Sequence, residues 1–405
     1  MANKNGGFIG TDGLDAPDPP TAVTPTAGDA QVSVAFTAPT DTGTSAITGF
    51  VAQVSTDDTD YSGGSNTGSS SPIVVSSLTN GTAYTAKVWA INAYGTSAPS
   101  DASSSFTPIP FQRGIFAGGY VSSATNIIEY ISIHTTGNAT DFGDCASSKA
   151  NMGAVSSSTR GCFTGDGNAL TNEIKYITIA TEGNETDFGD LIQTSSSQAG
   201  VSNGTRGCVA GGYDGNPNRT DRIEYITIAN TGNSTDFGNL INSGRRSTMG
   251  MINSTTRGII SGHQNGTSRT DDIEYITIAS TGDATDFGNL TNVRDSSAGV
   301  GSATRGVTCG GSTGGNGTDT MDYITIASTG NATDFGDLNV GSLLGSGLSS
   351  PTRGVIGTGQ NASGDRVDSI EYITIGTTGN GTDFGNLSGV RNQFSALSNC
   401  HGGIA

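Results

Sequence analysis

Histidine, tryptophan and long apolar runs are scarce in this sequence of 405 residues. With only three histidines and one tryptophan, a histidine-dependent triad or a histidine-rich metal site is not expected. No stretch approaches the roughly 20 apolar residues that span a bilayer, and the first ten residues lack the apolar core of a signal peptide. We therefore expect a protein that is made in a cytoplasm and does not insert into a membrane.

Positive charge is also in short supply. Lys and Arg number 18 against 36 Asp and Glu, which gives a formal charge of −18 and a pI of about 4.3. Such a chain repels polyanions at long range. Neither nucleic acid nor an anionic lipid surface is an expected partner.

The cysteines and the known catalytic motifs give no sign of chemistry. Five cysteines are an odd number with no C-x-x-C spacing, so they predict neither a disulfide framework nor a zinc site, and we expect small buried hydrophobes. No P-loop, dinucleotide fingerprint or G-x-S-x-G elbow is present. We expect no catalytic residue, no cofactor and no metal, although two carboxylates would suffice for a glycan hydrolase, which stays open as an alternative.

Glycine and small polar residues dominate what is there. The 62 glycines, with abundant Ser, Thr and Asn, suit many short strands joined by turns. Such compositions also occur in disordered chains, but here the apolar residues recur in strand-length runs. The proline-rich residues 16–20 mark a boundary, so we divide the chain into an arm (1–15), a first domain (16–110) and a second domain (111–405).

The first domain shows alternating apolar and polar residues at short intervals, as in Val32 to Phe36 and Tyr84 to Ile91, which favours a β-sandwich. The segment from Leu78 to Ser97 resembles the second half of a fibronectin type III domain. The resemblance implies a seven-stranded sandwich in which Tyr84 is the corner tyrosine and Phe36 stands where the family usually has a tryptophan. Domains of this family are spacers or adhesive modules.

The second domain is built from six internal repeats. Arg-Gly pairs mark them at intervals of about 48 residues, at Arg113, Arg160, Arg206, Arg257, Arg305 and Arg353, with His401-Gly402 in the next slot. Three or four short strands per repeat predict an all-β, six-bladed propeller. The segment Phe394 to Asn399 should complete the blade that begins at Arg113. An open solenoid is the alternative, but it does not explain this offset between the two ends of the domain.

The residues shared by all repeats are expected to be structural, because identical positions in successive blades spread around a ring instead of converging on one point. We expect the Asp of each Thr-Asp-Phe-Gly to cap a turn before a buried Phe. The repeated arginines should be donors, paired with those Asp or with Glu224, Glu274 and Glu371. The repeated Asp residues are Asp141, Asp187, Asp236, Asp286, Asp334 and Asp383.

The loops that differ between repeats are the candidate binding region, since loops on one rim of a rigid scaffold often determine specificity. Unselected loop drift explains their variation equally well, and the sequence identifies no ligand-binding residue. The unequal segments are 121–126, 214–222, 264–270, 312–318 and 361–366.

Two further resemblances bear on function. Gly118-Gly119 followed by Tyr130, and the equivalent pattern in other repeats, is similar to kelch repeats. The string from Ile273 to Leu290 resembles repeats in structural proteins of marine tailed bacteriophages, especially those of cyanobacteria. This implies a non-enzymatic virion protein, such as a tail fibre, tail appendage or head decoration. Its arm would bind other virion proteins, and its propeller, as a homo-oligomer on the particle, would face host glycans; a bacterial adhesin or lectin-like module is the alternative.

Overall fold

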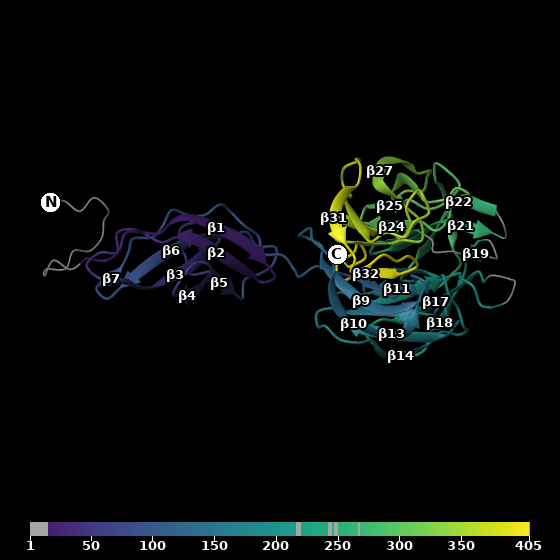
Figure 1. Ribbon diagram of the computed structural model, residues 1–405, viewed down its shortest axis with the longest axis horizontal. Helices are drawn as coiled ribbons and strands as arrows, with labels where there is room; N and C mark the ends of the chain where they lie inside the picture. Colours follow the sequence, from purple (N-terminus) through teal and green to yellow (C-terminus); the bar gives the residue numbers. More distant parts are fainter. Residues whose placement is uncertain (1–14, 216–219, 242–244, 247–249, 266–267, 405) are drawn as a thin grey trace. The chain divides into compact units, whose positions relative to one another are not determined.

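A computed structural model describes residues 15–215, 220–241, 245–246, 250–265 and 268–404, and every regular element among them is a β-strand. The chain divides into two units, Met1–Phe111 and Gln112–Ala405, which are treated separately below (Figure 1). The expected arm lies outside the described residues, apart from Asp15.

Unit 1 is a sandwich of two antiparallel sheets. One has the strand order β1-β2-β5 and the other β4-β3-β6-β7. The alternating burial of β2 and β6 places every second side chain in the core, as expected for sheets with one wet face. The strands are β1 (Thr21–Gly28), β2 (Gln31–Thr37), β3 (Ile47–Ser55), β4 (Gly64–Gly68), β5 (Ile73–Ser76), β6 (Thr85–Asn92) and β7 (Gly95–Thr96).

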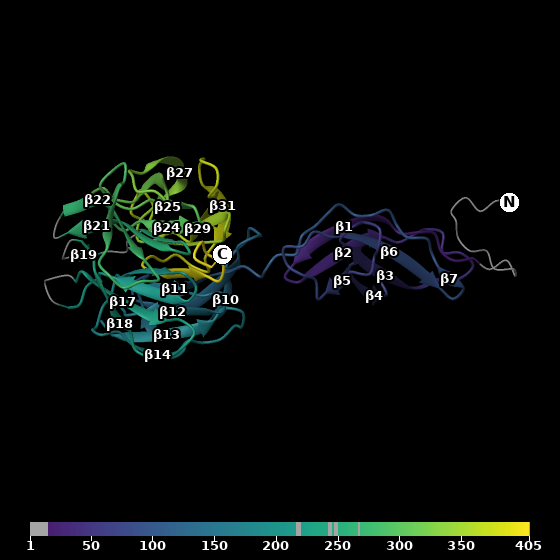
Figure 2. The ribbon, with the colours of Figure 1, turned by 180° about the vertical axis from the view of Figure 1, so that it is seen from behind.

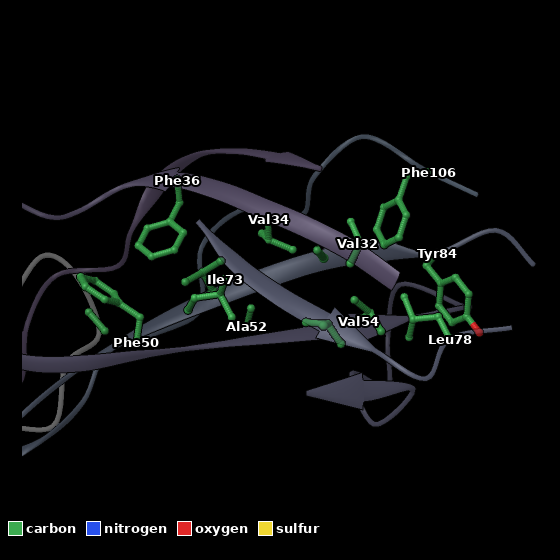
Figure 3. Close-up of a cluster of buried hydrophobic side chains, with 14 residues drawn as sticks. Val32, Val34, Phe36, Phe50, Ala52, Val54, Ile73, Leu78, Tyr84 and Phe106 are labelled. Carbon is green, nitrogen blue, oxygen red and sulfur yellow. The ribbon is translucent and has the colours of Figure 1, made fainter. Parts of the chain in front are cut away.

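The core of unit 1 lies between these sheets (Figure 3). Phe36 fills the position where the sequence suggested a missing tryptophan, and its ring lies 4.8 Å from that of Phe50. Tyr84 is buried, and its hydroxyl accepts a hydrogen bond from the backbone N–H of Thr79 at 3.2 Å. The prediction of a corner tyrosine at Tyr84 is confirmed.

Unit 2 contains six sheets, numbered here as repeat sheets 1 to 6 in chain order. Sheet 1 runs β32-β8-β9-β10, sheet 2 β11 to β14, sheet 3 β15 to β18, sheet 5 β24 to β27 and sheet 6 β28 to β31; in sheet 4, β19 and β20 both pair with β21, which is followed by β22 and β23. The strands of sheets 1 to 3 are β8 (Arg113–Ala117), β9 (Thr125–Ser132), β10 (Thr140–Lys149), β32 (Ser395–Ser398), β11 (Gly153–Ser156), β12 (Arg160–Thr164), β13 (Glu173–Thr178), β14 (Thr186–Asp190), β15 (Ala199–Ser202), β16 (Arg206–Ala210), β17 (Arg222–Thr227) and β18 (Thr235–Asn239). Those of sheets 4 to 6 are β19 (Arg245–Arg246), β20 (Gly250–Asn253), β21 (Arg257–Asn265), β22 (Ser268–Thr277), β23 (Thr285–Asn289), β24 (Ala298–Gly301), β25 (Arg305–Cys309), β26 (Thr318–Thr325), β27 (Thr333–Ser342), β28 (Ser346–Ser349), β29 (Arg353–Gly357), β30 (Ser369–Thr374) and β31 (Thr382–Asn386).

In each sheet, the strand that pairs with the Arg-Gly strand on the side away from the third strand is called here the inner strand (β20 in sheet 4), and it contacts the inner strands of the two neighbouring sheets. The contacts run β32, β11, β15, β20, β24, β28 and return to β32. In both ribbon views β11 and β24 lie toward the middle of unit 2, whereas β14 and β27 lie at its periphery (Figures 1 and 2). The C-terminal strand β32 pairs antiparallel with β8, so the prediction that Phe394 to Asn399 completes the sheet begun at Arg113 is confirmed.

Small residues let the inner strands approach one another. A Cβ added to Gly200 would collide with the backbone of Ala154, one added to Gly299 with that of Met251, and one added to Gly347 with that of Gly299. Larger side chains at these positions would push neighbouring sheets apart. The Gly/Ala/Ser-rich composition of the inner strands therefore follows from their packing.

Each boundary between sheets has the same backbone hydrogen bond. The N–H of a glycine in the Thr-Gly or Glu-Gly turn donates to the carbonyl of the Phe in the preceding sheet, at 2.7–2.9 Å. The Asn or Asp after that glycine accepts a second backbone N–H from the same sheet, at 2.9–3.1 Å. The glycine pairs with Phe in Gly137–Phe384, Gly183–Phe142, Gly232–Phe188, Gly282–Phe237, Gly330–Phe287 and Gly379–Phe335.

The Gly of each Thr-Asp-Phe-Gly is required at these boundaries. Gly385 has a φ of 145°, and a Cβ there would lie closer than 3.0 Å to the backbone of Gly137 in the neighbouring sheet. Both the left-handed conformation and the close approach exclude a side chain. The five equivalent glycines are Gly143, Gly189, Gly238, Gly288 and Gly336.

We predict that Gly385→Ala destabilises unit 2 by about 2 kcal/mol or more, because strain and a backbone clash act together. Thermal unfolding followed by circular dichroism measures the effect. Gly376→Ala is the matched control, because a Cβ there meets nothing within 4 Å and the backbone is not left-handed. Equal melting temperatures for the two variants would contradict the prediction.

Candidate functional site

The connections between strands place two different faces on unit 2. On one face, called the short-loop face, every connection between the first and second strand of sheets 2 to 6 has three residues, as in 157–159, and every connection between the third and fourth strand has seven, as in 179–185. On the other, the long-loop face, the connections between the second and third strand differ, from 118–124 in sheet 1 to 211–221 in sheet 3 and 358–368 in sheet 6. The unequal segments predicted from sequence therefore share one face.

The long-loop face is tied together by short backbone bridges. Tyr120 pairs with Asn392, Ser196 with Tyr213, Asp295 with Ser312, and Leu343 with Gln360. Each bridge joins the connection that enters a sheet to the loop within that sheet. The loops are thus anchored at their bases, and residues 216–219 and 266–267 at two tips lie outside the described part.

Two groups of side chains on the long-loop face could contact a ligand. The Arg366 guanidinium lies 5.4 Å from the centre of the Tyr120 ring, and its Nε donates to Asn392 Oδ1 at 3.3 Å. Arg269 Nε lies 3.0 Å from a carboxylate oxygen of Asp295. These arginines belong to the segments that differ between repeats, Arg366 in a loop and Arg269 at the start of β22, and not to the repeated Arg-Gly set, so periodicity could not single them out.

The repeated arginines have a different role from the one expected. Each donates from Nη1 to a backbone carbonyl of the next sheet, at 2.7–3.2 Å. Arg113 in sheet 1 donates to Ile179 in sheet 2, for example, and Arg353 in sheet 6 donates to Ile133 in sheet 1. Each guanidinium also lies 3.9–4.5 Å from the centre of a Tyr ring in its own sheet. These arginines thus bind carbonyls and tyrosine rings, and not the repeated Asp or Glu224, Glu274 and Glu371 as expected; among the described residues, Glu182 lies 3.8 Å from Arg113.

The repeated Asp residues lie on the outermost strands and are exposed. They lie within strands and do not cap turns, so that prediction is wrong, whereas the Phe that follows is buried in every repeat, as expected. One of them, Asp187, accepts a hydrogen bond from Lys175 on the adjacent strand at 2.9 Å. Charged residues on an outer edge discourage pairing with another strand.

A second set of carboxylates is buried and acts between sheets. A backbone N–H of the preceding sheet donates to each at 2.8–3.2 Å. Glu129 also pairs with the buried Arg391, and Asp322 with the buried Arg294; burial lowers the pKa of both arginines. The set consists of Glu129, Glu224, Glu274, Asp322 and Glu371.

In sheet 2 a different residue accepts the equivalent backbone N–H from the preceding sheet. Lys175 stands at the position of the buried carboxylate, and Glu185 from the next connection accepts the N–H of Ala146 at 2.8 Å. Lys149, which is buried, lies 2.8 Å from the same oxygen of Glu185. The departure of sheet 2 from the repeat is therefore compensated within the structure.

The centre of unit 2 leaves little room for a ligand. The inner strands enclose a cavity of about 20 Å³, which is enough for about one water molecule. Met251 lines this cavity and a second one of about 10 Å³. Small-molecule binding at the centre would require the inner strands to move apart.

His401 lines this cavity. Its Nδ1 accepts the N–H of Gly403 at 3.0 Å, so the proton is on Nε2, which lies 3.3 Å from the carbonyl of Ser156 and 3.1 Å from the hydroxyl of Ser202. Burial lowers the pKa of His401 to about 4. His401-Gly402 turns inward instead of starting another Arg-Gly strand, because β8 already occupies that place beside β32.

The cysteines are mostly buried, as expected. Four are buried and the fifth is partly buried, and burial raises the pKa of each thiol to about 12. Within the described residues no three His, Cys, Asp or Glu side chains are grouped to hold a metal ion. A search of that same part of the chain for a helix long and apolar enough to cross a bilayer found none.

The comparison with protein families identifies unit 1. Residues 15–106 match the model of the fibronectin type III domain, which confirms that resemblance and agrees with the sandwich and its corner tyrosine. A search of curated proteins gave no match to the sequence.

We predict that unit 2 loses stability on acidification between about pH 6.5 and 4 because of His401. The folded state keeps this histidine neutral down to a pKa of about 4, whereas in the unfolded chain it binds a proton near pH 6.5, so the unfolded state is favoured in this window by up to about 3 kcal/mol. The melting temperature of the protein and of His401→Gln should be measured from pH 7.5 to 4. The variant should show the smaller fall, and parallel curves would refute the assignment.

Proposed function

We infer that the six repeat sheets of unit 2 form a closed six-bladed β-propeller of kelch-like type. The cyclic contacts of the inner strands and the pairing of β32 with β8 support closure. The left-handed glycines at Gly118, Gly119, Gly211 and Gly212 support the likeness to the Gly-Gly pairs of kelch repeats. An open solenoid would leave its first and last sheets apart.

We propose that the chain is a non-enzymatic structural protein of a bacteriophage particle, as a tail fibre, tail appendage or head decoration. The resemblance of the Ile273 to Leu290 string to repeats of marine phage proteins supports this proposal. In this role the arm binds other virion proteins, unit 1 is a spacer, and several copies are mounted on the particle. Synthesis takes place in the host cytoplasm.

The distribution of differences between the repeats supports a display role. The short-loop face has equal connections throughout, whereas loop length and composition vary on the long-loop face. A rigid ring with one variable face is suited to recognition without chemistry. We propose that this face binds glycans of the host surface.

The environment of the charged groups also favours a role without catalysis. The buried carboxylates accept backbone N–H groups of a neighbouring sheet. Burial raises the pKa of Glu371, but its oxygens bind Asn339 and Val340 and face the preceding sheet. These carboxylates hold the sheets together through structural hydrogen bonds, so they are poor candidates for the proton donor or nucleophile of a hydrolase.

We predict that deleting residues 1–15 prevents incorporation of the protein into particles, because this arm is the proposed anchor. Purified particles analysed by immunoblot and mass spectrometry measure incorporation. The deleted protein must keep the circular dichroism spectrum and melting temperature of the full chain. Normal incorporation of the shortened protein would refute the anchor.

We predict that the full chain binds host polysaccharide on a glycan array and that Tyr120→Ala with Arg366→Ala weakens binding at least tenfold. The matched control is Ser158→Ala with Thr255→Ala, two exposed residues of the short-loop face. Binding that is equal in both double variants would exclude the long-loop face. Release of reducing sugar from the polysaccharide would instead support a hydrolase, and binding of the chain to bacterial cells from its own source organism would favour an adhesin.

A further inference from the structure

The outward face of the four-stranded sheet in unit 1 carries both polar and apolar side chains, with Trp89, Ile91 and Val51 close together. Along β6, Ala86, Val88 and Ala90 point into the core, so Thr85, Lys87, Trp89 and Ile91 point the other way. Across the sheet, Trp89 is opposite Val51, and Ile91 is opposite Gly49. Because residue 49 is a glycine, no side chain covers the sheet surface beside Ile91.

A hollow of about 350 Å³ lies at that place, which falls in the size range of small-molecule sites. Ile91 supplies the apolar side chain of this hollow, and Thr48, Thr67 and Ser69 supply hydroxyl groups; the ring of Phe50 belongs to the core of unit 1. The Thr48 hydroxyl donates to the carbonyl of Ile91 at 3.2 Å, which leaves its lone pairs as acceptors. All lining residues are uncharged, and they are Thr48, Gly49, Phe50, Thr67, Gly68, Ser69 and Ile91.

Gly49 lies at a shift in the register between β3 and β6, but the space around it does not require glycine. A Cβ there would meet only the carbonyl oxygen of Gly68, at an ordinary 3.4 Å, and the backbone is not left-handed. The neighbouring Gly68 differs, because its Cβ would lie 2.9 Å from Ile73. A glycine inside a strand costs about 0.5–1 kcal/mol relative to alanine, and such glycines often mark the close approach of a ligand.

A rigid aromatic group lies next to the hollow. The rings of Trp89 and Tyr61 are 6.2 Å apart in an edge-to-face arrangement, and the Lys87 ammonium lies 4.6 Å from the centre of the Tyr61 ring. The Tyr61 hydroxyl is held by Asp58 and Thr85. These side chains are already ordered, so a ligand that packs on them loses little further side-chain entropy.

We propose that this hollow binds a neutral pyranose unit of a glycan, with a C–H face of the sugar on Ile91 and Trp89 and its hydroxyls on Thr48, Thr67 and Ser69. A sugar ring presents the same combination of an apolar face and a hydroxyl edge. The uncharged lining and the formal charge of −18 select against anionic ligands. This site is independent of the long-loop face of unit 2.

Trp89 is the single tryptophan of the chain, so its fluorescence reports on this site. The full-length protein is titrated with maltotetraose, cellotetraose, mannotetraose and chitotetraose. We expect a saturable change in emission with at least one of them, with a dissociation constant in the millimolar range because the hollow is open to solvent. No change with any of the four sugars would overturn the proposal.

Two variants test the location. Gly49→Val fills the hollow and should weaken binding at least tenfold with no loss in melting temperature, and Thr67→Val removes a hydroxyl at nearly constant volume and should weaken it about threefold. Val74→Ser, at an exposed position on the other sheet, should bind normally. Unchanged affinity in Gly49→Val overturns the proposal; if that variant is unstable, unchanged affinity in Thr67→Val does so.

The same titration separates this site from the long-loop face. Tyr120→Ala with Arg366→Ala should leave the Trp89 response intact, whatever it does to binding on a glycan array. Loss of the Trp89 response in that double variant would place the sugar on unit 2 and overturn the assignment to unit 1.

Discussion

The architecture of unit 2 depends on one hydrogen bond that is made at every boundary between sheets, from the N–H of a turn glycine to the carbonyl of a Phe. This bond brings the backbones of two neighbouring sheets close together. The residue after the Phe must therefore also be a glycine, as at Gly385 opposite Gly137. Arg, Tyr and the buried carboxylates then act across the same boundaries. Since each sheet covers its apolar faces with the neighbouring sheets, the stability of the unit depends on these boundary contacts.

This arrangement explains why the residues most repeated in the sequence are poor candidates for function. Arg113 and its equivalents use their donors on carbonyls of the next sheet, and the Asn residues of the Asn-x-Thr triplets use Oδ1 on backbone N–H groups. A group engaged in this way is not available to a substrate. In the proposed display role, recognition by unit 2 would therefore fall to positions where the repeats differ, such as the loops that contain Tyr120 and Arg366.

Periodicity in the sequence was enough to predict the strands, the sixfold repeat and the pairing of the C-terminal strand with β8, because each rests on spacing and on the alternation of buried residues. It could not predict partners between sheets, since spacing along the chain does not show which atoms meet across a boundary. For this reason the sequence predicts carboxylate partners for the repeated arginines, whereas the structure shows backbone carbonyls. His401 and the exchange of Lys175 with Glu185 were missed for the same reason, although the single Lys at a position otherwise held by Glu or Asp was a visible signal.

The pairing of β32 with β8 sets a time order on folding. About 280 residues separate the two strands, and a ribosome needs roughly 15 to 60 s to add them. During that interval β8 is an unpaired edge, open to any complementary strand. The C-terminal strand of an identical chain fits this edge as well as the chain's own β32 does. Crowded synthesis on one messenger would therefore favour exchange of β32 between nascent neighbours, and the expected misfolded product is a strand-exchanged dimer.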